Sequence, residues 1–237
     1  GRDPGFRDVQ IGAMRDLTAS HTYTHHSSGA GAVTRRQWLV SMVPAGILAV
    51  AHAPAQAGGQ LEEPLIDSVR TALSASVNSA APPVPDFTDT ASRIAYLRWL
   101  GAMSTRLSRR KTDLETRKEF LQTVWYESKR AGLDTTLVLG LIQVESGFRK
   151  FAVSIAGARG YMQVMPFWTR VLASGDPSVL FHMQTNLRFG CVILRHYLDR
   201  ENGDLFMALG RYNGSRGKDT YPRAVMGASR QWQHTIV

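Results

Sequence analysis

The chain has 237 residues, of which 43% are hydrophobic, enough for one good core and a small accessory element. Its formal net charge of +9 predicts attraction to a polyanion but does not identify which one. The densest basic cluster, Arg109, Arg110 and Lys111, lacks the interleaved aromatic residues that stack on bases, which disfavours nucleic acid as a partner. Cys191 is the only cysteine, which excludes an internal disulfide, and its apolar neighbours predict a buried, unreactive thiol.

The N-terminal part of the chain has the pattern of an export signal. Arg35 and Arg36 precede an apolar run from Leu39 to Ala51, and a small-residue site ends at Ala57. This order resembles a twin-arginine signal cleaved after Ala57. The apolar run is shorter than the roughly 20 residues that span a bilayer, so we predict a removable signal over residues 34–57 and no permanent membrane anchor. A buried core helix is the alternative.

The segments on either side of this signal are polar or rich in small residues. Residues 1–33 are rich in Gly, Ser, Thr and His and are predicted to be a disordered extension. Residues 58–88 end in a proline-rich stretch and are predicted to be a linker, although Leu65 to Val77 is also compatible with one amphipathic helix.

Helical periodicity begins after this linker. Apolar residues recur at helical spacing in two stretches, which predicts accessory helices within residues 89–130: Ile94, Leu97, Leu100 and Met103 in the first, Phe120 and Val124 in the second. Gly132 then suits the end of a helix, and Asp134 suits the cap of the next. No strand-length alternation occurs, so we expect an all-α fold with its main domain over residues 131–237.

The candidate catalytic residue follows the most apolar helix. Residues 137–144 are apolar nearly all round, which places this helix at the centre of the domain, and Glu145 comes at its C-terminal end. A carboxylate beside an apolar core and near the negative end of a helix dipole should have a raised pKa. That property suits a general acid that protonates a glycosidic oxygen. The alternative is a helix-end glutamate that faces solvent.

Four motifs then occur in the order and spacing of a known family. Residues 145–148 read ESGF, residues 157–166 read GARGYMQVMP, residues 186–190 read NLRFG, and residues 208–214 read ALGRYNG. Together they resemble the soluble lytic transglycosylase catalytic domain, a member of the lysozyme-like superfamily. Two departures are Tyr161, where the family usually has Leu, and Gly210 with Arg211, where it usually has a pair of small residues.

The resemblance implies roles for seven residues. Glu145 would be the catalytic acid/base, and the substrate-binding residues would be Ser146, Met162, Gln163, Tyr212, Asn213 and Tyr221. Alternatives remain for three of them: Met162 as a core residue, Ser146 as a helix-end cap, and Tyr221 as a packing residue. No metal or cofactor is expected, since His182 and His196 lack the paired spacing of a zinc site.

The expected function follows from the resemblance and from the count of carboxylates. Ordinary glycosidases use two carboxylates, whereas no acidic residue after Glu145 is obviously placed as its partner. The resemblance implies an enzyme that cleaves the MurNAc–GlcNAc bond of peptidoglycan in the periplasm or cell envelope, with help from the substrate's N-acetyl group and formation of 1,6-anhydroMurNAc. A hydrolytic muramidase and a non-catalytic wall-binding or assembly protein are the alternatives, and envelope or secretion-machinery partners are possible.

Overall fold

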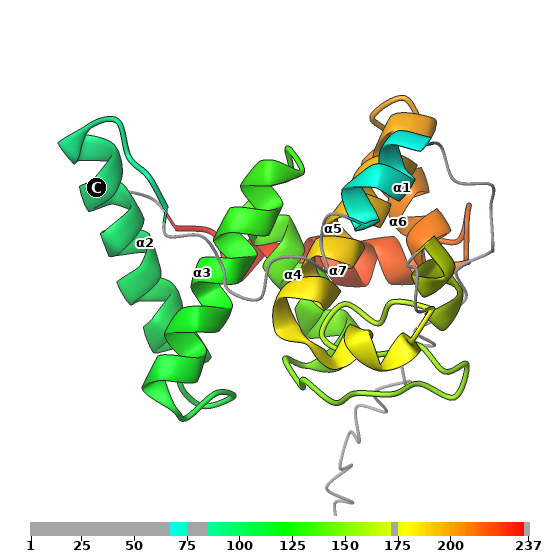
Figure 1. The fold of residues 1–237 in the computed structure, drawn as a ribbon. Coiled ribbons are helices and arrows are strands. Elements are labelled where there is room, and N and C mark those ends of the chain that lie inside the picture. Colours follow the sequence, from blue (N-terminus) through cyan, green and yellow to red (C-terminus); the bar gives the residue numbers. More distant parts are fainter. Residues whose placement is uncertain (1–66, 75–84, 172–174, 235–237) are drawn as a thin grey trace, which may run out of the picture. The chain divides into compact units, whose positions relative to one another are not determined.

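A computed structural model of the chain describes residues 67–74, 85–171 and 175–234 (Figure 1). The predicted extension over residues 1–33 and the predicted signal over residues 34–57 lie outside these residues. The described part forms helices connected by loops and contains two isolated β-bridges but no strand, so the prediction of an all-α fold is confirmed. The helices are α1 (Asp67–Ser74), α2 (Thr90–Leu107), α3 (Leu114–Arg130), α4 (Thr135–Ser146), η1 (Pro166–Val171), η2 (Pro177–Phe181), α5 (Met183–Arg200), α6 (Leu205–Asn213) and α7 (Thr220–Arg230).

Helices α2 and α3 lie where periodicity predicted two accessory helices, and they pack against each other. On α2, Met103 is fully buried, whereas Ile94 and Leu97 are 45% and 52% exposed. The apolar stripe therefore describes only the second half of α2. In its first half the side chains that face α3 are aromatic, with Tyr96 packed edge-on against Trp125.

One helix also lies in the segment predicted to be a linker. The amphipathic alternative over Leu65 to Val77 corresponds to α1, which packs against α5 and buries Leu73 completely. The division of the chain into a linker, accessory helices and a main domain stays a prediction. None of the described helices is long and apolar enough to cross a membrane.

Helix α4 lies in the core, as its composition predicted. Asp134 caps it by accepting a hydrogen bond from the backbone N–H of Thr136 at 2.7 Å, and Gly147 ends it with a left-handed φ of 57°. Its buried residues cover every side of the helix, because α3 and α7 both pack against it. The predicted burial of the thiol is also confirmed. Cys191 on α5 is buried, and burial raises the pKa of its thiol well above the usual value.

Helices α4 and α7 approach closely at a glycine. A Cβ built on Gly140 would lie 2.5 Å from the backbone N of Ser229 and 2.7 Å from its Cα, so no side chain fits there. This contact matters for the site, because α4 carries Glu145 and α7 carries Tyr221.

Gly140→Ala should therefore destabilise the fold. The new methyl group would force α4 and α7 apart, and overpacking of this kind costs about 1–3 kcal/mol or more. Gly101→Ala is the matched control, because a Cβ at Gly101 on α2 meets nothing within 4 Å. That change should instead stabilise the chain by roughly 0.5–1 kcal/mol through helix propensity. Urea unfolding of both variants checks the opposite signs, and equal effects would contradict the packing argument.

Candidate active site

Glu145 lies in the last turn of α4 with its carboxyl group buried; the residue is 8% exposed. The hydroxyl of Tyr221 donates a hydrogen bond to Oε1 at 2.5 Å. Oε2 is buried and accepts no hydrogen bond from any described residue. Burial raises the pKa of Glu145 to about 8, against the smaller lowering effect of the Tyr221 hydrogen bond. The predicted rise in pKa is confirmed, and the solvent-facing alternative is wrong.

Tyr221 stands at the beginning of α7 and is 6% exposed. Burial raises its pKa well above the usual value, and the neighbouring Glu145 raises it further. The phenol therefore stays protonated and acts as a permanent donor to one oxygen of the acid. Tyr221 is thus a packing residue and also a partner of Glu145.

The hydroxyl of Ser146 is engaged within the protein. It donates to the carbonyl oxygen of Tyr161 at 2.7 Å and contacts that of Ile142 at 3.2 Å, and the residue is 2% exposed. These bonds tie the end of α4 to the loop that contains residues 157–165. The geometry fits the helix-end role that was the alternative for Ser146.

Tyr161, one departure from the family pattern, contacts the segment between α2 and α3. Its hydroxyl accepts a hydrogen bond from Lys111 Nζ at 2.7 Å, and the same ammonium lies 4.9 Å from the ring centre of Phe120. Burial raises the pKa of Tyr161 to about 12 and lowers that of Lys111. Lys111, in the segment before α3, therefore stabilises the loop around Tyr161, and the carbonyl of Tyr161 in turn binds Ser146, the neighbour of Glu145.

Met162 and Gln163 shape this loop from inside. Met162 is fully buried, and a Cβ on Gly190 of α5 would lie 2.4 Å from its sulfur. Gln163 has a positive φ of 49°, and its Nε2 donates to the carbonyl oxygens of Gly160 at 2.9 Å and Ala152 at 3.1 Å. Neither side chain is exposed, so in this structure both support the loop.

Two of the predicted substrate-binding residues, Tyr212 and Asn213, lie at the end of α6. Tyr212 is fully buried, and its hydroxyl donates to the carbonyl oxygen of Met162 at 2.8 Å. Asn213 donates from Nδ2 to Ser215 Oγ at 3.1 Å, while its Oδ1 is buried without a hydrogen bond to the described residues. Tyr212 is also close enough to Tyr221 to raise the pKa of that phenol. Glu145, Tyr221 and Tyr212 therefore form one cluster, with the amide of Asn213 beside it in sequence.

Asn186 is a structural residue of this site that motif reading left without a role. Its Oδ1 accepts from the backbone N–H of Met162, and its Nδ2 donates to the carbonyl oxygens of Arg159 and Leu180, each at 2.8 Å. A Cβ on Gly160 would lie 2.3 Å from Nδ2, so this position requires glycine. Its signal in the sequence was its position in the first turn of α5, within the motif at residues 186–190.

The other carboxylates after Glu145 have partners or caps of their own. Asp176 and Asp204 cap η2 and α6, and Asp199 and Asp219 pair with arginines on their own helices. Glu201 pairs with Arg211 and Arg216, and the Arg216 hydrogen bond is the main reason that its pKa falls to about 2. Arg211, the second departure from the family pattern, is thus bound to Glu201.

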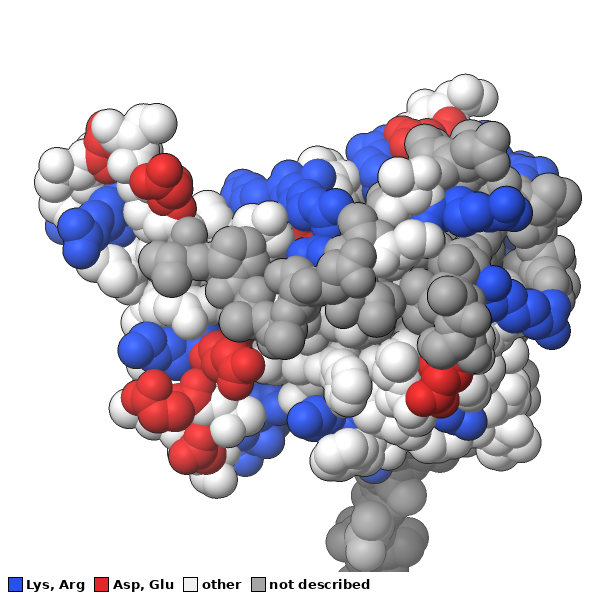
Figure 2. Space-filling view, viewed as in Figure 1, with Lys and Arg blue, Asp and Glu red and all other residues white. Residues whose placement is uncertain are grey.

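Charged groups on one face of the molecule are dispersed. On the face shown in Figure 2, Lys and Arg side chains lie in several separate places, with Asp and Glu between some of them. Within residues 67–74, 85–171 and 175–234, no group of three or more His, Cys, Asp or Glu side chains is placed to hold a metal ion.

The raised pKa of Glu145 predicts a specific dependence of stability on pH. Between its ordinary value of 4.5 and about 8, the folded chain keeps a proton that the unfolded chain releases. This group should therefore lower the free energy of unfolding by up to about 1.4 kcal/mol for each pH unit across that window, and by nothing further outside it. Glu145→Gln stays neutral throughout, so it should unfold like the parent chain at pH 4 and be more stable at pH 8. Urea unfolding at both pH values measures the difference, and equal stabilities at pH 8 would contradict the buried acid.

Comparison with known proteins identifies a family whose model matches part of the chain. Residues 122–234 match the model of the family described as "Transglycosylase SLT domain", a match that begins within α3. Membrane-bound lytic murein transglycosylase C of Haemophilus ducreyi is 34% identical over 115 residues, which are 42% of this chain and 31% of that protein. The protein of the same name from Glaesserella parasuis is 49% identical over 85 residues, which are 32% and 23% of the two chains. The chain therefore spans a third or less of these relatives.

A solved structure is also similar. The X-ray structure of an inactive mutant of lytic transglycosylase Slt from Pseudomonas aeruginosa matches with a TM-score of 0.43 and 24% identity, covering 59% of this chain and 29% of that one. The resemblance expected from the four motifs is confirmed by this match of residues 122–234 to the transglycosylase SLT domain.

Proposed function

We propose that the chain is a lytic murein transglycosylase that cleaves the β-1,4 bond between MurNAc and GlcNAc in peptidoglycan. The observation that carries this proposal is the buried Glu145, which is a neutral acid at pH 7 because its pKa is about 8. The SLT family match and the names of the relatives support peptidoglycan as the substrate.

The first step is protonation of the leaving oxygen. Tyr221 binds Oε1 of Glu145, whereas Oε2 has no partner in the described part of the chain, so we assign the transferred proton to Oε2. Its proton passes to the glycosidic oxygen as the bond to C1 breaks, and the carbonyl oxygen of the substrate's own N-acetyl group bonds to C1. Glu145 is then a carboxylate.

The second step returns the proton. The carboxylate of Glu145 takes the proton of the C6 hydroxyl, O6 bonds to C1, and the N-acetyl oxygen leaves. The product carries a 1,6-anhydroMurNAc end, and the acid is regenerated. A single carboxylate is sufficient for both steps, which agrees with the caps and ion pairs that engage Asp176, Asp199, Glu201, Asp204 and Asp219.

Digestion of purified peptidoglycan followed by mass spectrometry tests this proposal. A transglycosylase releases anhydro-muropeptides, each lighter by one water than the product of hydrolysis. Products with only reducing, hydrated ends would replace the proposal with a hydrolytic muramidase. No release of muropeptides, together with sedimentation of the chain with the peptidoglycan, would favour a wall-binding protein.

Tyr221→Phe should change the pH dependence of this reaction. The Tyr221 hydrogen bond lowers the pKa of Glu145, so its loss should raise that pKa and extend activity to higher pH. The rate at the optimum should fall, by about tenfold, because the carboxyl group loses the bond that orients it. A pH–rate profile on soluble glycan strands measures both effects. An alkaline limb that stays at the parent's pH would contradict this role for Tyr221.

We further propose that the enzyme acts in the periplasm or cell envelope after export through the signal at residues 34–57. The relatives' names describe membrane-bound proteins that act on murein, which supports the envelope. Fractionation of cells that express the chain with Arg35→Lys and Arg36→Lys tests the signal, and unchanged export would contradict the twin-arginine route.

A further inference from the structure

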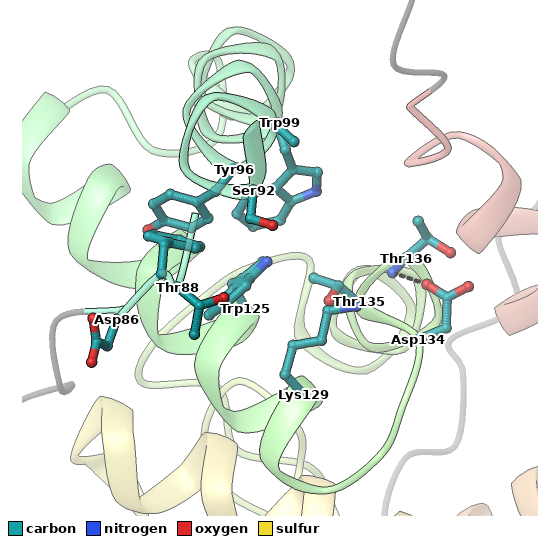
Figure 3. Close-up of a pocket in the computed structure, with 12 residues that line it drawn as sticks. Asp86, Thr88, Ser92, Tyr96, Trp99, Trp125, Lys129, Asp134, Thr135 and Thr136 are labelled. Carbon is teal, nitrogen blue, oxygen red and sulfur yellow. Dashed lines mark hydrogen bonds between the residues drawn. The ribbon is translucent and has the colours of Figure 1, made fainter. Parts of the chain in front are cut away.

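A hollow lies between α2, α3 and the beginning of α4, apart from the site of Glu145 (Figure 3). Its volume is about 550 Å³, within the range of pockets that hold small ligands. It is lined at one end of α4 by Thr135 and Thr136, whereas Glu145 lies at the other end of that helix. At 1.5 Å per residue, about 15 Å of helix axis separate the two places.

Four aromatic rings form one wall of this hollow, which we name the aromatic cleft. Tyr96 lies at the centre: its ring centre is 5.0 Å from those of Phe87 and Trp125, and it stacks on Trp99 at 6.0 Å. Tyr96 is buried, but Trp99 and Trp125 are only half-buried and keep ring surface for a ligand. The two indoles are thus held in place by the rings behind them.

Polar groups complete the lining. Figure 3 shows Lys129, at the end of α3, and Thr135 and Thr136, at the beginning of α4, together with Ser92 on α2. Asp134 also lines the cleft while its Oδ1 caps α4. The cleft therefore combines two half-buried indole rings with hydroxyl, carboxylate and ammonium groups.

This combination matches a pyranose. The C–H groups on the face of a sugar ring pack against the electron-rich face of an indole, while its hydroxyl and N-acetyl groups need hydrogen-bond partners at the edge. The lining carries two carboxylates, Asp86 and Asp134, against the single ammonium of Lys129, which disfavours a phosphate or another anion.

We propose that the aromatic cleft is an accessory binding site for N-acetylated sugar units of the glycan strand, separate from the site of Glu145. The choice of glycan rests on the proposed function. Held at this second point, a long strand stays on the enzyme between cuts, whereas a short fragment gains nothing from it.

Binding of the β-1,4-linked GlcNAc hexamer, measured by calorimetry on the full chain with Glu145→Gln, tests the site. In this background, Trp99→Ala should weaken the cleft's component of binding by about tenfold through loss of one stacking face. Leu97→Ala is the matched control, because Leu97 is 52% exposed on the same helix and does not line the cleft. It should bind the hexamer like its parent.

Trp99→Ala also removes packing between α2 and α3, so a second variant is needed. Ala95→Leu places a larger side chain in the cleft without removing any ring, and it should keep the thermal midpoint while weakening binding. Binding unchanged in both variants, or no binding of the hexamer by the parent, would overturn the proposal. Binding that falls only as far as the folded fraction falls would also overturn it, because the rings would then serve packing alone.

The two proposals fail separately. A parent chain that cleaves peptidoglycan while Trp99→Ala and Ala95→Leu leave hexamer binding intact retains its function and loses the accessory site. A chain that yields no anhydro-muropeptides but loses hexamer binding in both variants retains the site and loses the proposed reaction.

Discussion

Glu145→Gln should lower the rate of glycan cleavage by about 10²–10⁴-fold, the contribution typical of a general acid. Glutamine has nearly the shape of the protonated glutamate and should keep a hydrogen bond with Tyr221, but it has no proton to transfer. The loss should therefore appear in kcat with little change in binding of the strand. Release of muropeptides from purified peptidoglycan, measured over time at pH 6, gives the rate.

Asp199→Asn is the matched control for this loss. It removes one negative charge from a helix end in the same domain, but the Asp199 side chain is 64% exposed and paired with Arg195. Its rate should stay within about twofold of the parent, because exposed ion pairs contribute little. A Glu145→Gln variant that still cleaves at a tenth of the parent's rate would move the acid to another residue.

The position of the acid was predictable because its causes are local. Asp134 and Gly147 are of residue types that begin and end a helix. The residues between them are apolar on nearly every side, so this helix can shield them from water only in a core. Burial of Glu145 follows from that position, and the raised pKa follows from burial. Each step could therefore be predicted from residues within one helix, although the burial itself comes from α3 and α7 packing against it.

The partners of the other site residues depend on contacts between distant segments. Motif spacing identified Tyr212 and Met162, but the hydrogen bond from the Tyr212 hydroxyl to the Met162 carbonyl joins residues 50 positions apart. The bond from Lys111 to Tyr161 spans the same separation. Which hydroxyl meets which carbonyl is decided by how the helices pack, and a single sequence does not contain that information in readable form.

The same limit applied to the buried ion pair between α3 and α5. Glu127 continues the buried face of α3 that Phe120 and Val124 define, yet a charged residue there was not read as a core residue. Arg188 donates hydrogen bonds to both carboxylate oxygens of Glu127. Its Nε lies 2.9 Å from Oε1 and 3.0 Å from Oε2, and its Nη2 lies 2.8 Å from Oε1. The pair is 1% and 5% exposed.

Arg188→Met should lower the free energy of unfolding by about 3–5 kcal/mol. The change removes the guanidinium that binds both oxygens of Glu127. The carboxylate then stays in the core, and its remaining ion pair is the 3.6 Å contact with Arg130. Urea unfolding measures the loss. The exposed pair of Arg195 and Asp199 on the same helix is the control, and Asp199→Asn should cost less than about 1 kcal/mol.

The double variant Glu127→Met with Arg188→Leu separates two explanations of that loss. If the cost of Arg188→Met comes mainly from the buried charge left behind, removing both charges should recover most of the stability, because apolar side chains of similar volume often replace a buried ion pair at no net cost. If the attraction between Glu127 and Arg188 is itself the source of stability, the double variant should be as unstable as the single one. We expect recovery, since desolvation of two fully buried charges offsets most of their attraction.

Helix α5 also carries Asn186, which holds the loop beside Glu145. A recovered double variant that still cleaves peptidoglycan would therefore show that the ion pair orients α5 no better than apolar packing does.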